Sequence, residues 1–133
     1  MKPERIDLRG AGDLDDIVRR VVQTRLREVE GLASGLERRD KQGLHDLRIA
    51  CKRLRYALER FEELDPLLAK QAQHFSALQD ALGEAHDRDV LLTILPPTMG
   101  KTQQRLQQER ERCVDRAAEL WKQPIGRDGS HEI

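Results

Sequence analysis

The stretch LHDLRIACKRLRYALERF, residues 44–61, decides the fold because its apolar and basic residues separate onto two faces of one helix. At the helical step of about 100° per residue, a set of apolar side chains falls on the face opposite His45. These side chains are Leu47, Ala50, Leu54, Ala57, Leu58 and Phe61. A stripe of this length needs apolar neighbours to cover it, so the stretch predicts a helix packed against other helices.

The other face of this predicted helix is basic. Its 18 residues hold four arginines and one lysine against one aspartate and one glutamate, whereas the whole chain balances 24 cations with 24 anions. Like charges three or four residues apart destabilise a helix by roughly 0.2–0.5 kcal/mol per pair, and a bound anion would relieve that repulsion. The residues concerned are His45, Arg48, Lys52 and Arg55, with Tyr56 at the edge and Arg53 between the two faces.

Two other interpretations of the basic face stay open at this stage. It can be a solvated charged surface, which is what most charge runs are. It can also be neutralised by the acidic region 61–93, which has seven acids and two bases. The acids are Glu62, Glu63, Asp65, Asp80, Glu84, Asp87 and Asp89.

The rest of the chain also has helical patterns and no convincing alternation of period two, so we expect an all-α fold. The helices are predicted at about 14–38, 44–64, 66–95 and 99–122, as an antiparallel four-helix bundle or helical-hairpin array. Residues 39–43 form a polar break, Asp65 and Pro66 open the third helix as cap and first residue, and Gly83 is a candidate bend. We expect a flexible N-terminus over 1–12, one helical domain over 13–122 and a disordered tail over 123–133.

Composition limits the classes of function. Zero net charge argues against bulk attraction to nucleic acid or anionic membrane, so any electrostatic function depends on local clusters. No apolar run resembles a signal peptide or a membrane span. Cys51 and Cys113 fall on apolar faces of predicted helices, which favours buried free thiols and a reducing, cytoplasmic setting.

Arg25 lies near the middle of the apolar stripe of the first predicted helix. Burial of an unpaired guanidinium is very costly, so Arg25 needs a partner or a wet cavity. We expect a salt bridge to Asp87 or Asp89; otherwise Arg25 points into the same anion-holding space as the basic face.

The stretch at 44–61, followed by LQDALGEAHDRDVLLTIL at 78–95, resembles the CHAD family of conserved-histidine α-helical domains. The first block matches the pattern His-x-x-Arg-x-x-x-Lys-Arg-Leu-Arg-Tyr at every named position. The resemblance implies binding of inorganic polyphosphate in a basic channel lined by helices, without catalysis, and we expect no cofactor or metal. It implies as ligands His45, Arg48, Lys52, Arg53, Arg55 and Tyr56, then His86 and Arg88, while Asp87 and Asp89 are expected to orient arginines.

Family members usually carry two related helical halves around one channel, whereas this sequence has one such block. Two chains can associate to rebuild the channel, one half can bind weakly alone, or the half can be a remnant; of these we expect a homodimer that completes the channel. The corresponding location is the cytoplasm, in association with polyphosphate granules.

Three rival functions remain. His45-Asp46 and His86-Asp87 resemble the metal ligands of all-α phosphohydrolases, but the neighbouring cations would repel a metal ion. Nucleic-acid binding would use the same basic face, yet only 3 % of the residues are aromatic and few bases could stack. A helical scaffold for protein interactions is the third.

Overall fold

The computed structural model describes residues 2–123, and no strand occurs among them. In chain order the elements are α1 (Leu14–Leu32), α2 (Gly35–Arg38), α3 (Lys41–Phe61), the 3₁₀ turn η1 (Glu62–Leu64), α4 (Pro66–Ile94) and α5 (Gly100–Lys122). The predicted all-α class is confirmed. Residues 124–133 of the predicted disordered tail lie outside the described part of the chain.

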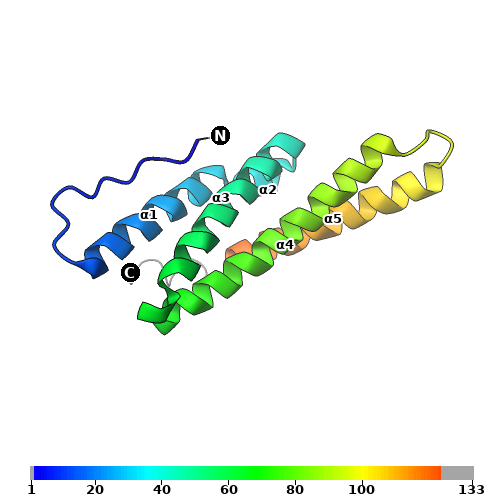
Figure 1. Cartoon of the computed structure of the whole chain (residues 1–133). Helices are drawn as coiled ribbons and strands as arrows, with labels where there is room; N and C mark the ends of the chain where they lie inside the picture. Colours follow the sequence, from blue (N-terminus) through cyan, green and yellow to red (C-terminus); the bar gives the residue numbers. More distant parts are fainter. Residues whose placement is uncertain (1, 124–133) are drawn as a thin grey trace.

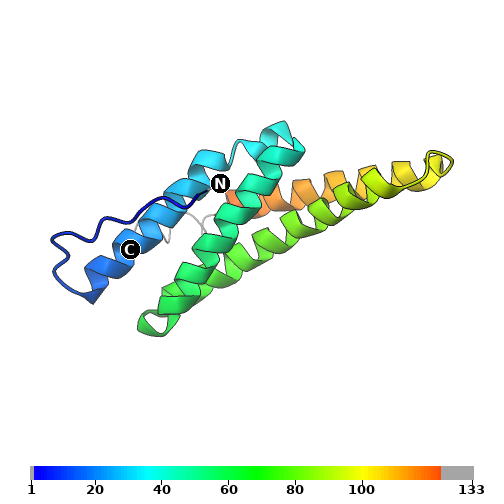
Figure 2. The same cartoon turned by 45° about the horizontal axis from the view of Figure 1, so that its top comes forward.

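Each long helix packs on the next one along the chain: α1 on α3, α3 on α4, and α4 on α5. Figures 1 and 2 show α4 and α5 as a long antiparallel hairpin whose closed end projects beyond α1 and α3. The segment before α1 runs back along that helix (Figure 1), where the backbone N–H of Glu4 donates to the Glu28 carboxylate at 2.9 Å. The architecture is therefore an array of helical hairpins with α3 and α4 at its centre.

The core lies along α3 and α4. The predicted apolar face of α3 is confirmed, since Leu47, Leu54 and Leu58 are each at most 1 % exposed. They pack with α4 side chains such as Phe75 and Leu78 in one cluster. Burial of one such side chain stabilises the fold by about 1.5–3 kcal/mol, so this face holds α3 in a fixed rotation.

The first helix ends earlier than predicted. The apolar pattern continues at helical spacing to Leu36, but α1 stops at Leu32 and a separate turn, α2, follows. A Cβ at Gly35 would lie 3.0 Å from the carbonyl carbon and oxygen of Gly43, so the backbones of α2 and α3 touch here. This close approach requires the chain to turn, and the poor helix formers Ser34 and Gly35 allow it.

The starts of α3 and α4 are set by aspartate caps. Asp40 accepts a hydrogen bond from the backbone N–H of Gly43 at 2.9 Å, so α3 begins at Lys41 rather than after the predicted polar break. Asp65 accepts from the N–H of Leu67 at 2.9 Å, ahead of a proline at the first helical position, as predicted. Helix α4 then continues through Gly83 to Ile94 as one element.

Candidate anion-binding site

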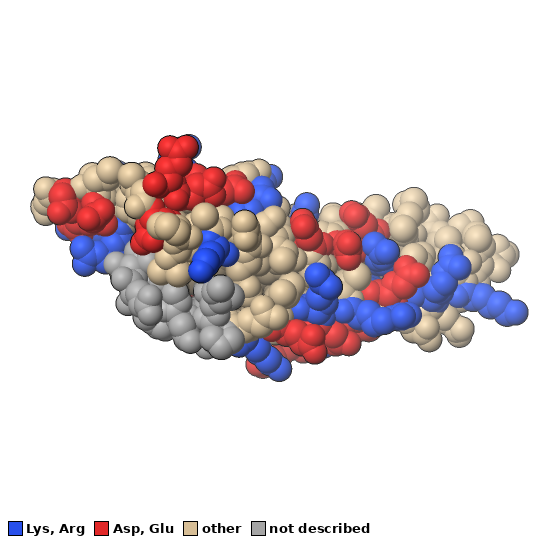
Figure 3. All heavy atoms as spheres, turned by 90° about the horizontal axis from the view of Figure 1, so that it is seen from below, with Lys and Arg blue, Asp and Glu red and all other residues tan. Residues whose placement is uncertain are grey.

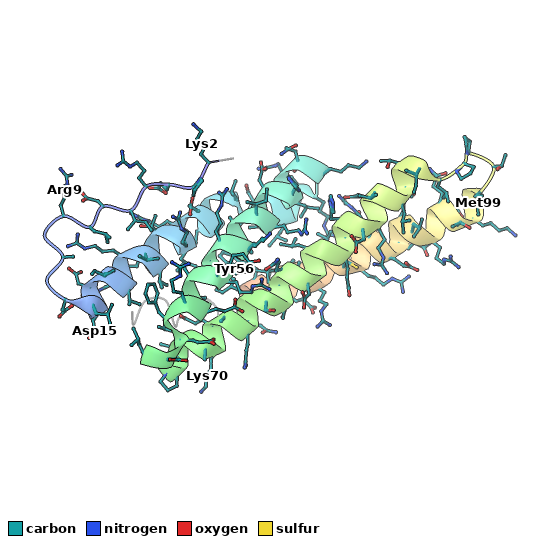
Figure 4. The ribbon with its side chains drawn as sticks, viewed as in Figure 1. Lys2, Arg9, Asp15, Tyr56, Lys70 and Met99 are labelled. Carbon is teal, nitrogen blue, oxygen red and sulfur yellow. The ribbon has the colours of Figure 1, made fainter. Side chains whose placement is uncertain are left out.

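Four cationic or titratable side chains lie on one face of α3, and we call His45, Arg48, Lys52 and Arg55 the basic stripe. Lys52 is exposed and the other three are half-buried. Tyr56, labelled in Figure 4, lies beside them on α3 with 50 % of its surface exposed. Because the core fixes the opposite face of α3, the stripe stays outside the core.

Tyr56 organises the C-terminal end of the stripe. The guanidinium carbon of Arg55 lies 4.8 Å from the centroid of the Tyr56 ring, and Lys52 Nζ lies 5.7 Å from it. Each such contact contributes about 0.5–1 kcal/mol at an exposed site. Arg55 Nε also lies 3.9 Å from Glu59 on the next turn, a loose ion pair. The ring thus holds two cations close together with little neutralisation.

The middle of the stripe carries charge without a counter-ion. In the described part of the chain, neither Arg48 nor Lys52 makes an ion pair, so the acids of α4 do not neutralise these two cations. Arg48 lies against α4 at Gly83, where a Cβ would stand 3.8 Å from its Nε atom. Arg53 is half-buried beside the stripe.

The structure brings His86 to the stripe and Arg88 away from it. The ring centroids of His45 and His86 are 5.8 Å apart, which joins the two sequence blocks across the α3–α4 contact. Arg88 instead approaches Glu109 of α5 at 3.4 Å. Arg88 was a candidate ligand, but its side chain lies on the face of α4 that α5 covers.

The two aspartates near His86 have different surroundings. Asp89 accepts from Arg110 Nε at 3.1 Å, and both side chains are largely buried. Asp87 is exposed and has no ion pair within the described residues.

Sequence reasoning missed Arg110, although its spacing between the buried Leu106 and Val114 marks it as an arginine on an apolar face.

The expected partner of Arg25 was wrong. Arg25 Nη1 pairs with Glu28 on the same helix at 2.7 Å and donates to the Glu4 carbonyl at 3.1 Å. It does not pair with Asp87 or Asp89, because α1 packs on α3 whereas those acids lie on α4. Arg25 does line a cavity of about 310 Å³ with Tyr56, between α1 and α3.

Several arginines outside the stripe are paired with acids. Arg39 bonds Glu111 at 2.8 Å and also contacts Asp115. The hydrogen bond from Arg39, with a second from Arg110, lowers the pKa of Glu111. Figure 3 shows one face of the molecule, on which Lys and Arg alternate with Asp and Glu along the projecting hairpin. The basic stripe differs from this pattern by having cations in excess.

The described residues include no cluster of three or more His, Cys, Asp or Glu side chains that could hold a metal ion. None of the described helices combines the length and apolar character needed to cross a membrane.

The comparison with known families decides the relationship. The family model of the CHAD domain matches residues 3–96, which include α1 to α4 and both histidine blocks. The chain belongs to the CHAD domain family. The basic stripe and His86 lie within the part that matches the CHAD domain. Searches of curated proteins and of solved structures gave no match.

Proposed function

We propose that this CHAD domain binds inorganic polyphosphate along the basic stripe and does not hydrolyse it. The observation that carries the proposal is the pair Arg48 and Lys52, one turn apart on α3 and without ion-pair partners in the described part of the chain. Membership of a family associated with polyphosphate supports the same ligand.

The chemistry of the stripe suits a linear polyanion. Arginine offers paired N–H donors to phosphate oxygens, lysine offers a point charge, and a protonated histidine adds a donor. A polyanion that meets such a stripe releases its counter-ions, so affinity falls as salt rises. His45 and Arg55 are ten residues apart, so the stripe is about 15 Å long and contacts several phosphates at once.

Two charge-matched variants test the site. R48Q/K52Q removes the unpaired cations and one source of repulsion within α3, so we expect normal folding by circular dichroism. Polyphosphate affinity should fall about tenfold or more, with a shallower dependence on salt. K70Q/R116Q removes the same charge from exposed positions on α4 and α5 and should bind like the wild type. Equal losses in the two variants would contradict the assignment of the site.

Nucleic-acid binding is tested in the same assay. Polyphosphate and single-stranded DNA of equal charge are titrated at two salt concentrations. We expect tighter binding of polyphosphate, because α3 has only one Phe, Tyr or Trp side chain beside the stripe, Tyr56, on which a base could stack. Equal affinities would reduce the proposal to general polyanion binding.

Phosphate release in the presence and absence of divalent metals tests the non-catalytic role, and sustained release would overturn it.

We also propose that two copies associate and supply two basic stripes to one ligand. The projecting hairpin carries Leu91 and Met99 at 44 % and 43 % exposure and Ile94 at 71 %, and a second copy would cover these side chains. Light scattering measures the mass with and without polyphosphate. A dimer weakened by I94E is expected; a monomer under both conditions would contradict it.

The location that follows is the cytoplasm, at polyphosphate granules. Fluorescence microscopy of the tagged protein tests it in cells with and without polyphosphate. A diffuse signal in both would contradict granule association.

A further inference from the structure

A cavity of about 310 Å³ lies where the start of α3 meets α4, at one end of the basic stripe. The two imidazoles described above face each other there, with ring centroids 5.8 Å apart and ring planes inclined by 34°. The lining residues are Lys41, Gln42 and His45 from α3, and His86, Asp89, Val90 and Thr93 from α4. All of these residues except Val90 carry polar or titratable groups, and the cavity is open to solvent and meets the stripe at His45.

Neither imidazole is neutralised by a carboxylate among the described residues. Asp89 lines the cavity, but Arg110 of α5 holds it at 3.1 Å. Asp46 on α3 accepts from Gln42 at 2.9 Å. The side chains of His45 and His86 make no hydrogen bond or ion pair with the described part of the chain.

The fixed charges near the cavity balance, so protonation of the imidazoles is what makes it cationic. Lys41 lines it, and Arg48 follows His45 by one helical turn without a counter-ion in the described chain. Two acids oppose these cations: exposed Asp87, which adjoins His86 on α4, and Asp46, whose partner Gln42 carries no charge. Two protonated imidazoles this close repel each other and both neighbouring cations. A phosphate group in the cavity, beside the two rings, would accept an N–H from each ring and remove that repulsion.

We propose that His45 and His86 form a proton-linked phosphate subsite, through which acidification raises the affinity of the chain for polyphosphate. This inference rests on the proposed function and adds regulation to it. Histidine gains its charge between pH 5 and 8, whereas lysine and arginine side chains stay charged across that range. The stripe cations thus give an affinity that is independent of pH, and the histidine pair gives an increment that depends on it.

The direction of the pH dependence follows from the linkage between proton binding and anion binding. An anion that binds the protonated pair better than the neutral pair takes up protons on binding. The association constant therefore rises as pH falls through the titration of the pair and levels off at both ends. Each ring contributes at most one proton, so the slope of log affinity against pH lies between zero and about −2.

The experiment measures polyphosphate affinity at pH 5.5, 6.5, 7.5 and 8.5 at constant ionic strength. For the wild type we expect affinity at pH 5.5 to exceed that at pH 8.5 by at least about tenfold. In H86Q the logarithm of this ratio should fall to about half or less, and H45Q should act in the same direction. K70Q/R116Q should keep the wild-type ratio. Protonation of the ligand itself is common to all four proteins, so the difference between variants carries the test.

Histidine NMR signals give a second measurement that does not depend on the affinity of a variant. Saturating polyphosphate should move the titration of His45 and His86 to higher pH and leave the buried His74 unmoved. A ratio unchanged in both H86Q and H45Q, with no shift in these titrations, would overturn the inference. If the wild type binds at every pH without such a slope, the proton link fails alone. If it does not bind at any pH, the proposed function fails.

Discussion

At the scale of single residues, the two cysteines differ in their surroundings. Cys51 is fully buried in the core cluster, and this burial raises the pKa of its thiol to about 12. Cys113 is partly buried beside Glu84, and burial raises its pKa less strongly. Only the thiolate reacts with alkylating reagents, so the two thiols should separate clearly in rate.

We expect an alkylating reagent at pH 8 to modify Cys113 first in the folded protein. Cys51 should react only when the protein unfolds, because a depressed thiolate fraction and burial both protect it. Mass spectrometry with time follows the two sites, and C113S shows the rate of Cys51 alone. Equal rates in the native protein would contradict the described packing of Cys51.

The residues of the site were predictable where they depend on one helix. The helical step of about 100° per residue placed Arg48, Lys52 and Arg55 on one face of α3, and the apolar face fixes the rotation of that helix. The meeting of His45 with His86 depends instead on the register of α3 against α4, which no local pattern encodes.

Arg25 was assigned a distant partner although Glu28, one turn away on α1, forms its salt bridge.

At the scale of elements, two helical glycines have opposite roles. Gly83 lies inside α4, where a Cβ would only come within 3.8 Å of Arg48 Nε. Gly35 in α2 touches the backbone of Gly43, which cannot yield as a flexible side chain can.

We therefore expect G83A to stabilise the protein by about 0.5–1 kcal/mol, the difference in helix propensity between alanine and glycine. G35A should destabilise it by about 1–3 kcal/mol, because an added methyl group overpacks the contact between α2 and α3. Urea unfolding monitored by circular dichroism gives both values. The same sign for the two substitutions would contradict this account.

Helix boundaries were predictable where a cap and a proline coincide, as at Asp65 and Pro66. The break after Leu32 was missed because apolar spacing continues through it, and the contact of Gly35 with Gly43 decides it. The start of α3 was placed three residues late, since Asp40 was counted as part of a polar break rather than as a cap.

At the scale of the whole molecule, Arg110 ties three parts together. From α5 it donates to Asp89 on α4 at 3.1 Å and to the Arg39 carbonyl, between α2 and α3, at 2.7 Å. The side chains of Arg110 and Asp89 are only 11 % and 13 % exposed, so the pair is shielded from water.

R110Q should cost about 3 kcal/mol of unfolding free energy, because it leaves the carboxylate of Asp89 buried without its cation. R112Q is the matched control on the same helix, since Arg112 is exposed and, among residues 2–123, donates only to the Gln108 carbonyl. Thermal or urea unfolding of both variants measures the difference. Equal stability of the two would show that the buried pair is dispensable.

The CHAD match ends at residue 96, whereas the hairpin partner α5 begins at Gly100. A fragment trimmed to the matched residues would keep the whole basic stripe but strip α4 of the helix that covers it, together with the buried Val114 and Ala117. Such a fragment should precipitate, and its failure in a binding assay would be a false negative about the ligand. The shortest unit worth purifying therefore extends to Lys122.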